Sequence, residues 1–202
     1  MPETKRYDRA YFDRWYHDPS HSVVHQDLLG RRVQLAIAAA EYLLERPIRN
    51  VLDVGCGEAR WRAWILRARP KVRYVGVDSS EYVLRRYGKS RDIRQGSLAT
   101  LGRMKLPGRF DLIVCSDVLH YVATPELRAG LRAIARRLRG MAFLEAFPRE
   151  DDTVGDDVGY QKRAAATYRR LFREAGLVRL GLHCYAGPTL ADRLTTLERA
   201  DG

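Results

Sequence analysis

One acid and two glycines stand close together in the stretch VLDVGCGEARW, residues 51–61. Asp53 lies inside an apolar run that is typical of a buried strand, and Gly55, Gly57 and the small Ala59 follow it. A carboxylate is costly to bury unless a cation or a hydrogen-bond donor meets it. Glycines directly after a strand allow a tight turn that brings the backbone close to a ligand. The spacing therefore predicts a ligand site with a buried acid beside it.

A dinucleotide is one candidate for this ligand, and the spacing of the small residues argues against it. The dinucleotide fingerprint places a third glycine three positions after the second. That position is Arg60, and the third small residue comes one position earlier, at Ala59. We therefore do not expect an NAD-binding turn here.

Strand-like and helical runs alternate along the chain and must position this turn. Strand-like runs occupy residues 51–54, 72–78, 92–97, 110–117, 140–147 and 177–185. Helical runs occupy residues 30–46, 58–69, 80–88, 124–139 and 162–176. Such alternation predicts parallel strands joined by crossover helices. The expected fold is a doubly wound α/β fold, with a mainly parallel sheet and helices on both faces, in which ligands bind at the carboxyl edge of the sheet.

Three motifs together resemble the class I S-adenosylmethionine-dependent methyltransferases over roughly residues 48–185. VLDVGCGEA is similar to the first motif of that family. Asp78, at the end of YVGVD and 21 residues after Gly57, matches the family's acid for the ribose hydroxyls. FDLIVCSDVLHYV (110–122) resembles the fourth strand, which lines the methyl-transfer cleft. The resemblance implies a Rossmann-like domain that uses S-adenosylmethionine and releases S-adenosylhomocysteine.

The resemblance also implies a set of site residues at the ends of the strands. The cofactor-binding candidates there are Asp53, Gly55, Cys56, Gly57, Asp78, Ser79, Gly96, Ser97, Leu98, Ser116 and Asp117. His120 and Tyr121 follow the fourth strand and are the catalytic candidates. A histidine that titrates near neutrality could take a proton from a substrate hydroxyl or amine. The alternative is that His120 only packs beside the cofactor, because methyl transfer mostly needs alignment.

The sequence departs from the pattern of the family at three places. Ala59 replaces the usual last glycine of the turn. Ser97 stands where the family often has an acid for the adenine amine, and its hydroxyl accepts a hydrogen bond more weakly. About 17 residues follow the last predicted strand, and GPTLADRLTTLER reads as helix. We therefore expect the seventh strand of the family to be missing or displaced.

An aromatic cluster of Tyr11, Trp15 and Tyr16 precedes the predicted fold. It could form a lid over cofactor and substrate, since a sulfonium cation favours aromatic faces, and Tyr11 and Trp15 are therefore further cofactor-binding candidates. It could instead be a staple that holds an N-terminal helix on the sheet. DPSHS (18–22) would serve as the hinge of a lid. We expect a helical cap over residues 1–47 and the Rossmann-like domain over residues 48–202.

The net charge of +11 lies in the middle of the chain, within residues 51–140. Its basic runs, residues 67–73, 85–94 and 136–139, fall on predicted helices and loops and carry few interleaved aromatic residues. They indicate a solvated surface, with an RNA or membrane-surface footprint as the alternative.

The acidic loop 148–157 follows the strand of Glu145 and could attract a cationic amine substrate. The alternative is ordinary solvated charge.

Cysteine usage and the apolar pattern bear on the compartment of the protein. Cys56, Cys115 and Cys184 are odd in number and far apart, which indicates reduced thiols rather than a disulfide or a metal site. There is no stretch of 18 apolar residues and no apolar core of a signal peptide. We therefore expect a cytoplasmic protein with no membrane partner and no metal.

The sequence predicts an enzyme that moves a methyl group from S-adenosylmethionine to a nitrogen or oxygen atom of a small molecule. One alternative is an RNA or protein methyltransferase that uses the basic surface. Against it, SDVL (116–119) stands where enzymes that methylate base amines carry an N-P-P-Y-type tetrapeptide, so nucleic acid is not the expected partner. A second alternative is a non-catalytic module that binds the same cofactor.

Overall fold

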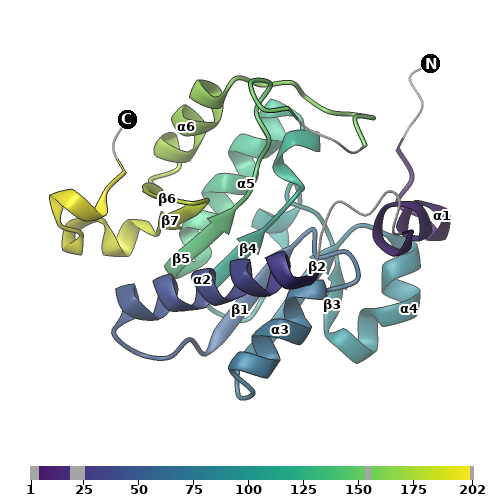
Figure 1. Cartoon of the computed structure of the whole chain (residues 1–202), viewed down its shortest axis with the longest axis horizontal. Coiled ribbons are helices and arrows are strands. Elements are labelled where there is room, and N and C mark those ends of the chain that lie inside the picture. The colour runs from purple at the N-terminus through teal and green to yellow at the C-terminus, as the bar shows by residue number, and fades with distance from the viewer. Residues whose placement is uncertain (1–4, 19–25, 153–155, 201–202) are drawn as a thin grey trace.

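The computed structural model describes residues 5–18, 26–152 and 156–200, which form one sheet with helices on both sides (Figure 1). The strands are β1 (Asn50–Val54), β2 (Arg73–Asp78), β3 (Ile93–Gln95), β4 (Phe110–Cys115), β5 (Leu138–Leu144), β6 (Val178–Gly181) and β7 (Cys184–Ala186). The helices are α1 (Arg9–Phe12), α2 (Gln26–Leu44), α3 (Arg60–Ala68), α4 (Glu81–Arg91), α5 (Thr124–Arg137) and α6 (Ala165–Glu174). Short η helices are η1 (Asp13–His17), η2 (Leu101–Arg103), η3 (Leu119–Tyr121), η4 (Pro188–Arg193) and η5 (Thr196–Glu198).

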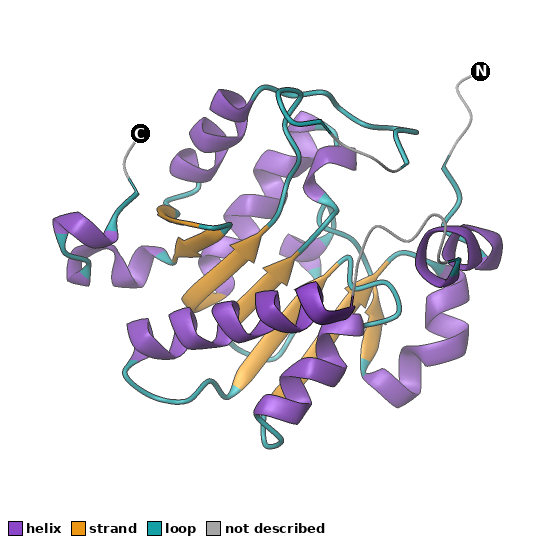
Figure 2. Ribbon diagram, viewed as in Figure 1, coloured by secondary structure: helices purple, strands orange, loops and turns teal. Residues whose placement is uncertain are grey.

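The order of the strands in the sheet is β3-β2-β1-β4-β5-β7-β6 (Figure 2). Strand β7 pairs antiparallel with both β5 and β6, and the other neighbouring pairs are parallel. The direction of winding reverses between β1 and β4, which is where such sheets bind ligands. The predicted doubly wound, mainly parallel sheet is therefore confirmed.

The expectation of a missing or displaced seventh strand is wrong. The run 177–185, predicted as one strand, contains β6 and the first two residues of β7. Leu182 and His183 join them with φ of 49° and 65°, the left-handed conformation that suits a two-residue hairpin turn. The sequence hid this turn because neither residue is the glycine or asparagine that usually marks one. The segment after β7 forms the short helices η4 and η5 rather than one longer helix.

Both faces of the sheet are buried, which explains why its central strands read as continuous apolar runs. Leu131 and Ile134 of α5 pack on one face, together with α6. Val33 and Ile37 of α2 pack on the other face, together with α3 (Figure 1). Along β1 successive side chains alternate between these faces, so Asp53 shares the α2 face with Val51.

The described part of the chain contains no helix long and apolar enough to cross a membrane. Cys56, Cys115 and Cys184 are free thiols, of which Cys115 and Cys184 are buried. No group of three His, Cys, Asp or Glu side chains among the described residues is arranged to hold a metal ion.

Candidate functional site

The glycine turn follows the carboxyl end of β1 and is hydrogen-bonded to that of β2. The backbone N–H of Gly55 donates to the carbonyl of Val77 at 2.7 Å, and that of Gly57 donates to Asp78 Oδ2 at 2.7 Å. Gly55 and Gly57 have φ of +71° and +50°, which glycine adopts without strain. Ala59 takes the place of the family's third glycine at φ +57°, so it carries the cost of its Cβ, about 1 kcal/mol.

Asp78 is fixed at the carboxyl end of β2. Its two oxygens accept the backbone N–H groups of Gly57 and Ser80, the latter at 2.8 Å, and its side chain is buried. Burial raises the pKa of Asp78, and the backbone N–H groups at residues 57, 79 and 80 act against that rise. The carboxylate faces a cavity of about 210 Å³ that Gly96, Ser97 and Leu98 also line.

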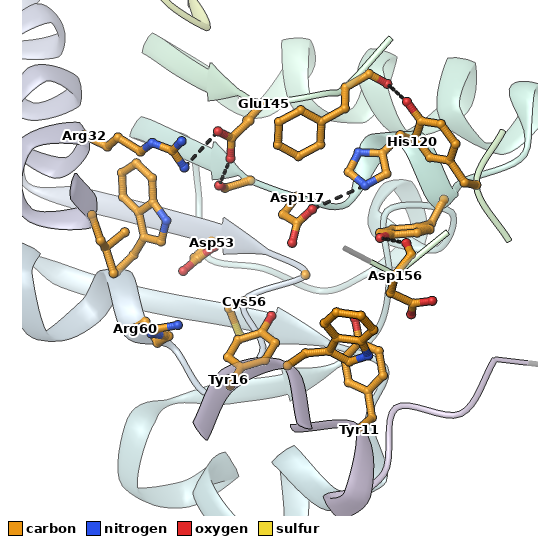
Figure 3. A pocket seen from close by; sticks show the side chains of 18 of the residues that line it. Tyr11, Tyr16, Arg32, Asp53, Cys56, Arg60, Asp117, His120, Glu145 and Asp156 are labelled. Carbon is orange, nitrogen blue, oxygen red and sulfur yellow. Dashed lines mark hydrogen bonds and ion pairs between the residues drawn. The ribbon is translucent and has the colours of Figure 1, made fainter. Parts of the chain in front are cut away.

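A larger cavity of about 470 Å³ opens beside the first, at the carboxyl ends of β1, β4 and β5 (Figure 3). Gly55, Asp117, Tyr11, Tyr16 and Tyr121 line both cavities, so the two meet along these residues. All of the predicted site residues line one cavity or both, including Cys56, Ser79 and Ser116. The fold thus gathers at one edge of the sheet residues that lie up to 110 positions apart.

Asp53 faces the larger cavity from β1 (Figure 3). The hydroxyl of Tyr74 donates to its Oδ2 at 2.7 Å. Burial raises the pKa of Asp53 to about 7, the Tyr74 hydrogen bond opposes that rise, and the charge of Asp78 adds to it. A cationic group that enters the cavity would therefore find an acid poised to ionise beside it.

Glu145 lies just beyond β5 and is buried at the inner wall of the same cavity. Arg32 Nη1 of α2 lies 2.9 Å from Glu145 Oε1, and Ser116 Oγ donates to Oε2 at 2.5 Å (Figure 3). Sequence reasoning missed Arg32. An arginine at this position of a predicted helix is expected on the solvent face. Only the packing of α2 on the sheet directs its side chain toward the cavity.

His120 and Asp117 form the part of the wall that follows β4 (Figure 3). His120 Nε2 lies 3.3 Å from Asp117 Oδ1, and the histidine is 2% exposed. Its Nδ1 is buried and accepts or donates no hydrogen bond among the described residues. Asp117 has φ +60°, an unusual conformation for a residue with a side chain and one that is found preferentially at functional sites.

Tyr121 lies beside His120, with ring centroids 4.2 Å apart. Its hydroxyl donates to the backbone carbonyl of Asp156 at 2.6 Å, and burial raises its pKa. Lys5 Nζ lies 3.4 Å from the centroid of the Tyr121 ring and 2.7 Å from Asp156 Oδ2. The hydroxyl is thus occupied, and the residue offers the cavities its aromatic ring.

The N-terminal segment 7–17 covers the glycine turn. Phe12 is 2% exposed and belongs to the core on the α2 face. A Cβ built on Gly57 would lie 3.3 Å from Phe12 and 3.4 Å from the hydroxyl of Tyr16. Tyr11, Trp15 and Tyr16 line the cavities. The segment is therefore both packed on the domain and part of the cavity wall. Residues 19–22 of the predicted hinge lie outside the described residues.

His17 connects this segment to the turn. Its Nδ1 lies 3.1 Å from Asp13 Oδ1, and its Nε2 lies 3.1 Å from Glu58 Oε2. These two hydrogen bonds raise the pKa of His17 above its ordinary value. Nothing in the sequence pattern indicated the pairing of His17 with Glu58, since 41 positions separate the two residues.

Residues 52–144 match the family model described as a methyltransferase domain. An uncharacterised protein of Synechococcus sp. is 31% identical over 111 residues, covering 52% of this chain and 26% of that protein. The chain thus spans about a quarter of the length of this curated relative.

Solved structures with a similar fold include two methyltransferases. Magnesium protoporphyrin IX methyltransferase from Synechocystis PCC 6803, with bound S-adenosylhomocysteine, gives a TM-score of 0.59 at 19% identity, over 89% of this chain and 95% of that one. The plantazolicin methyltransferase, in complex with a pentazolic desmethyl analogue and S-adenosylhomocysteine, gives 0.62 at 13% identity, over 83% and 74%. At sequence identities of 13% and 19%, these two structures show that the fold is similar.

The strand order, the glycine turn and the family match agree with one another. The matched methyltransferase domain, residues 52–144, is just under half of the chain and runs from the first strand and its turn to the end of β5. The whole sheet has a fold similar to that of the solved methyltransferases.

Proposed function

We propose that this chain transfers a methyl group from S-adenosylmethionine to a nitrogen or oxygen atom of a small molecule. The observation that carries the proposal is the pair of cavities that meet at Gly55 and Asp117, beside the switch in strand order. The larger cavity, about 470 Å³, has the volume of sites that enclose small molecules. A cofactor with its nucleoside part in the smaller cavity and its methionine part against the wall of the larger one would present its methyl group to an acceptor in the rest of the larger cavity.

The residues of the smaller cavity fit the nucleoside part of this cofactor. Each Asp78 oxygen accepts one backbone N–H and keeps a lone pair, so the carboxylate can accept two ribose hydroxyls. Buried Asp53, with its raised pKa, suits the α-ammonium group of the methionine part. When bound, S-adenosylmethionine supplies an electrophilic methyl group on a positively charged sulfur.

Each predicted site residue has a proposed role in this arrangement. We assign the adenine to Gly96, Ser97 and Leu98, the ribose to Asp78 and Ser79, and the methionine part to Asp53, Gly55, Cys56, Gly57, Ser116 and Asp117. Tyr11 and Trp15 cover the site and limit access of water, which strengthens alignment. Tyr121 contributes its ring to the wall, because its hydroxyl already donates to Asp156.

His120 is the proposed proton acceptor. The carboxylate of Asp117, 3.3 Å from Nε2, favours the tautomer with hydrogen on that nitrogen. The lone pair then resides on Nδ1, which has no partner among the described residues. When the methyl group is transferred, a proton that leaves the nitrogen or oxygen atom of the methyl acceptor would pass to Nδ1 of His120.

RNA is the less favoured acceptor. None of the basic runs 67–73, 85–94 and 136–139 lines either cavity. Asp151, Asp152 and Asp157 line the larger one and would repel a phosphate backbone. These observations favour a small molecule over a nucleic acid.

Calorimetric titration with S-adenosylhomocysteine tests the cofactor site. Replacing Asp78 by Asn removes the charge and one acceptor for the ribose hydroxyls. It should weaken binding by about 1–3 kcal/mol, roughly 5- to 150-fold in Kd. Asp192→Asn, an exposed acid in η4 that lines neither cavity, is the matched control and should bind as the wild type does.

Thermal unfolding of both variants shows whether the loss comes from misfolding, since Asp78 also anchors the turn. Unaltered affinity in a folded Asp78→Asn protein would overturn the cofactor assignment. Transfer of labelled methyl groups from S-adenosylmethionine into a metabolite extract, compared with an RNA pool, then tests the class of acceptor. Incorporation into RNA alone would overturn the small-molecule assignment.

A further inference from the structure

The larger cavity is acidic although the protein is basic. Seven carboxylates line it, against two arginines, in a chain whose net charge is +11. The carboxylates are Asp53, Asp117, Glu145, Asp151, Asp152, Asp156 and Asp157. Such a concentration of one sign in a cleft raises the local concentration of ligands of the opposite sign.

The mouth of the cavity is formed by three exposed carboxylates, which have no ion-pair partner in the described part of the chain, whereas two other carboxylates of the wall do. Glu145 has Arg32 as its partner, and Asp156 has Lys5. Asp151, Asp152 and Asp157 are exposed and form no ion pair among the described residues. A cation that approaches the cavity therefore meets carboxylates still open to pairing.

Aromatic side chains make up much of the remaining wall. Trp15, Trp61, Phe147 and Tyr160 line it together with Tyr121. Aromatic faces attract ammonium groups and also hold flat apolar bodies. The protein already holds one primary ammonium in this way, because Lys5 Nζ lies over the Tyr121 ring and beside the Asp156 carboxylate.

His120 adds an observation that is independent of the acidic residues. It is buried to 98%, lines the cavity, and has an Nδ1 with no hydrogen-bond partner among the described residues. Nδ1 itself has almost no exposed surface, so the ring must rotate for a ligand N–H to reach it. A buried acceptor without a partner is costly, so a ligand that donates an N–H to it gains a favourable bond. An ammonium group is such a donor.

We infer that the methyl acceptor is a small amine, cationic in solution, that carries an apolar or aromatic body. The inference rests on the proposed function and names the substrate class for the same site. The carboxylates at the mouth attract the ammonium, the aromatic wall holds the body, and His120 and Asp117 receive the nitrogen at the inner end. The cavity of about 470 Å³ also takes the methionine part of the cofactor, and the space that is left suits a small free amine.

The transfer step balances with these groups alone. The ammonium gives one proton to His120 Nδ1, which leaves a neutral amine with a lone pair. That lone pair forms the new nitrogen–carbon bond while the carbon–sulfur bond breaks and its electrons stay on sulfur. The positive charge of the sulfonium ends on the methylated nitrogen. No oxidant, reductant or metal is needed.

Binding of matched probes to the full chain saturated with S-adenosylhomocysteine tests the inference. The probes are 2-phenylethylamine, 2-phenylethanol and 3-phenylpropanoate, which share a phenyl ring and differ in charge. Calorimetry should show the amine binding about tenfold more tightly than the alcohol, and the carboxylate more weakly still. Equal or tighter binding of the alcohol or the carboxylate would overturn the inference.

The double variant Asp152→Asn with Asp157→Asn locates the effect. It should bring the Kd of the amine within about twofold of that of the alcohol, with the alcohol itself unchanged. Asp192→Asn, with the same chemical change outside both cavities, should keep the full preference. An amine preference that persists in the double variant would overturn the role of the acidic mouth.

Titration with S-adenosylhomocysteine alone keeps the two proposals separate. If the wild type fails to bind it, the proposed function falls. If it binds and the amine has no preference over the alcohol, only the acceptor class falls. With S-adenosylmethionine in place of the product, mass spectrometry should detect N-methylated 2-phenylethylamine and no methylated alcohol.

Discussion

A Cβ atom added at Gly55 would lie 2.4 Å from Cγ2 of Val118, and the residue has φ +71°. Two separate costs therefore apply to any other residue at this position, one from the backbone and one from the clash. Substitution of Gly108 would carry only the backbone cost, because this residue has φ +59° and an added Cβ would have nothing within 4 Å. The two glycines form a matched pair.

We expect Gly55→Ala to destabilise the protein by about 1–3 kcal/mol more than Gly108→Ala does, because only the first adds overpacking to the backbone strain. Urea unfolding of both variants measures the difference. Gly55→Ala should also weaken binding of S-adenosylhomocysteine, since the turn must shift to admit the methyl group. Equal losses of stability in the two variants would contradict the close packing of Val118 on the turn.

Asp53 makes the stability of the protein depend on pH. Burial raises its pKa to about 7, whereas an unfolded chain ionises its aspartates near pH 4. Between these values the folded state keeps a proton that the unfolded state has lost, so stability falls as the pH rises from about 4 to about 7. Above that window the folded state carries the full cost of a buried carboxylate.

Asp53→Asn keeps an acceptor for Tyr74 and removes the titration. Relative to the wild type, its free energy of unfolding should rise by on the order of a few kcal/mol between about pH 4 and about pH 8. Denaturant unfolding at the two pH values measures this, with Asp192→Asn as the control. A difference between Asp53→Asn and wild type that stays constant with pH would show that Asp53 is ionised in the folded state throughout.

At the scale of elements, the N-terminal segment 7–17 is held over the glycine turn by His17 and by the buried Phe12. The hydrogen bonds to Asp13 and Glu58 raise the pKa of His17, so the charged pairing is complete below about pH 6.5, the pKa of an unfolded histidine. It is lost as the pH rises through the higher pKa of the folded state.

Tryptic cleavage after Arg14, an exposed residue of this segment, reports how firmly it is held. We expect His17→Gln to be cleaved several-fold faster than the wild type near pH 6, and at a similar rate near pH 9, where the wild-type pairing has also been lost. The ratio of the two rates cancels the pH dependence of the protease. A ratio of one at both pH values would mean that Phe12 and the aromatic contacts hold the segment without His17.

At the scale of the whole molecule, charge is divided between a basic exterior and an acidic cavity. RNA should bind the exterior weakly, with a dissociation constant in the micromolar range or above at about 0.15 M salt, and should bind less as salt rises. Filter binding over a salt series, with a parallel assay for methyl incorporation, checks this. Tight binding at that salt, with methylated RNA as product, would move the acceptor from small molecules to RNA.

The sequence alone determined the fold class and the residues of the glycine turn. Strand and helix periodicities differ, so their alternation marked each central element, and the turn at Gly55 and Gly57 needs left-handed backbone that glycine supplies. Asp78 was predicted from the resemblance to the methyltransferases, and the length of one crossover helix is consistent with its place one strand over from the turn. These features depend on residues that are close together along the chain, so the residue order is enough to predict them.

Only the tertiary structure decided the hairpin of β6 and β7, and which side chains complete the cavity walls. The two central residues of the hairpin turn, Leu182 and His183, are not glycines, so the turn is specified by the pairing of β7 with β5 and with β6 rather than by those two residue types. Arg32 meets Glu145, and His17 meets Glu58, across separations of 113 and 41 positions. Such contacts depend on how the helices pack on the sheet, and this packing cannot be inferred from the spacing of residues along the chain.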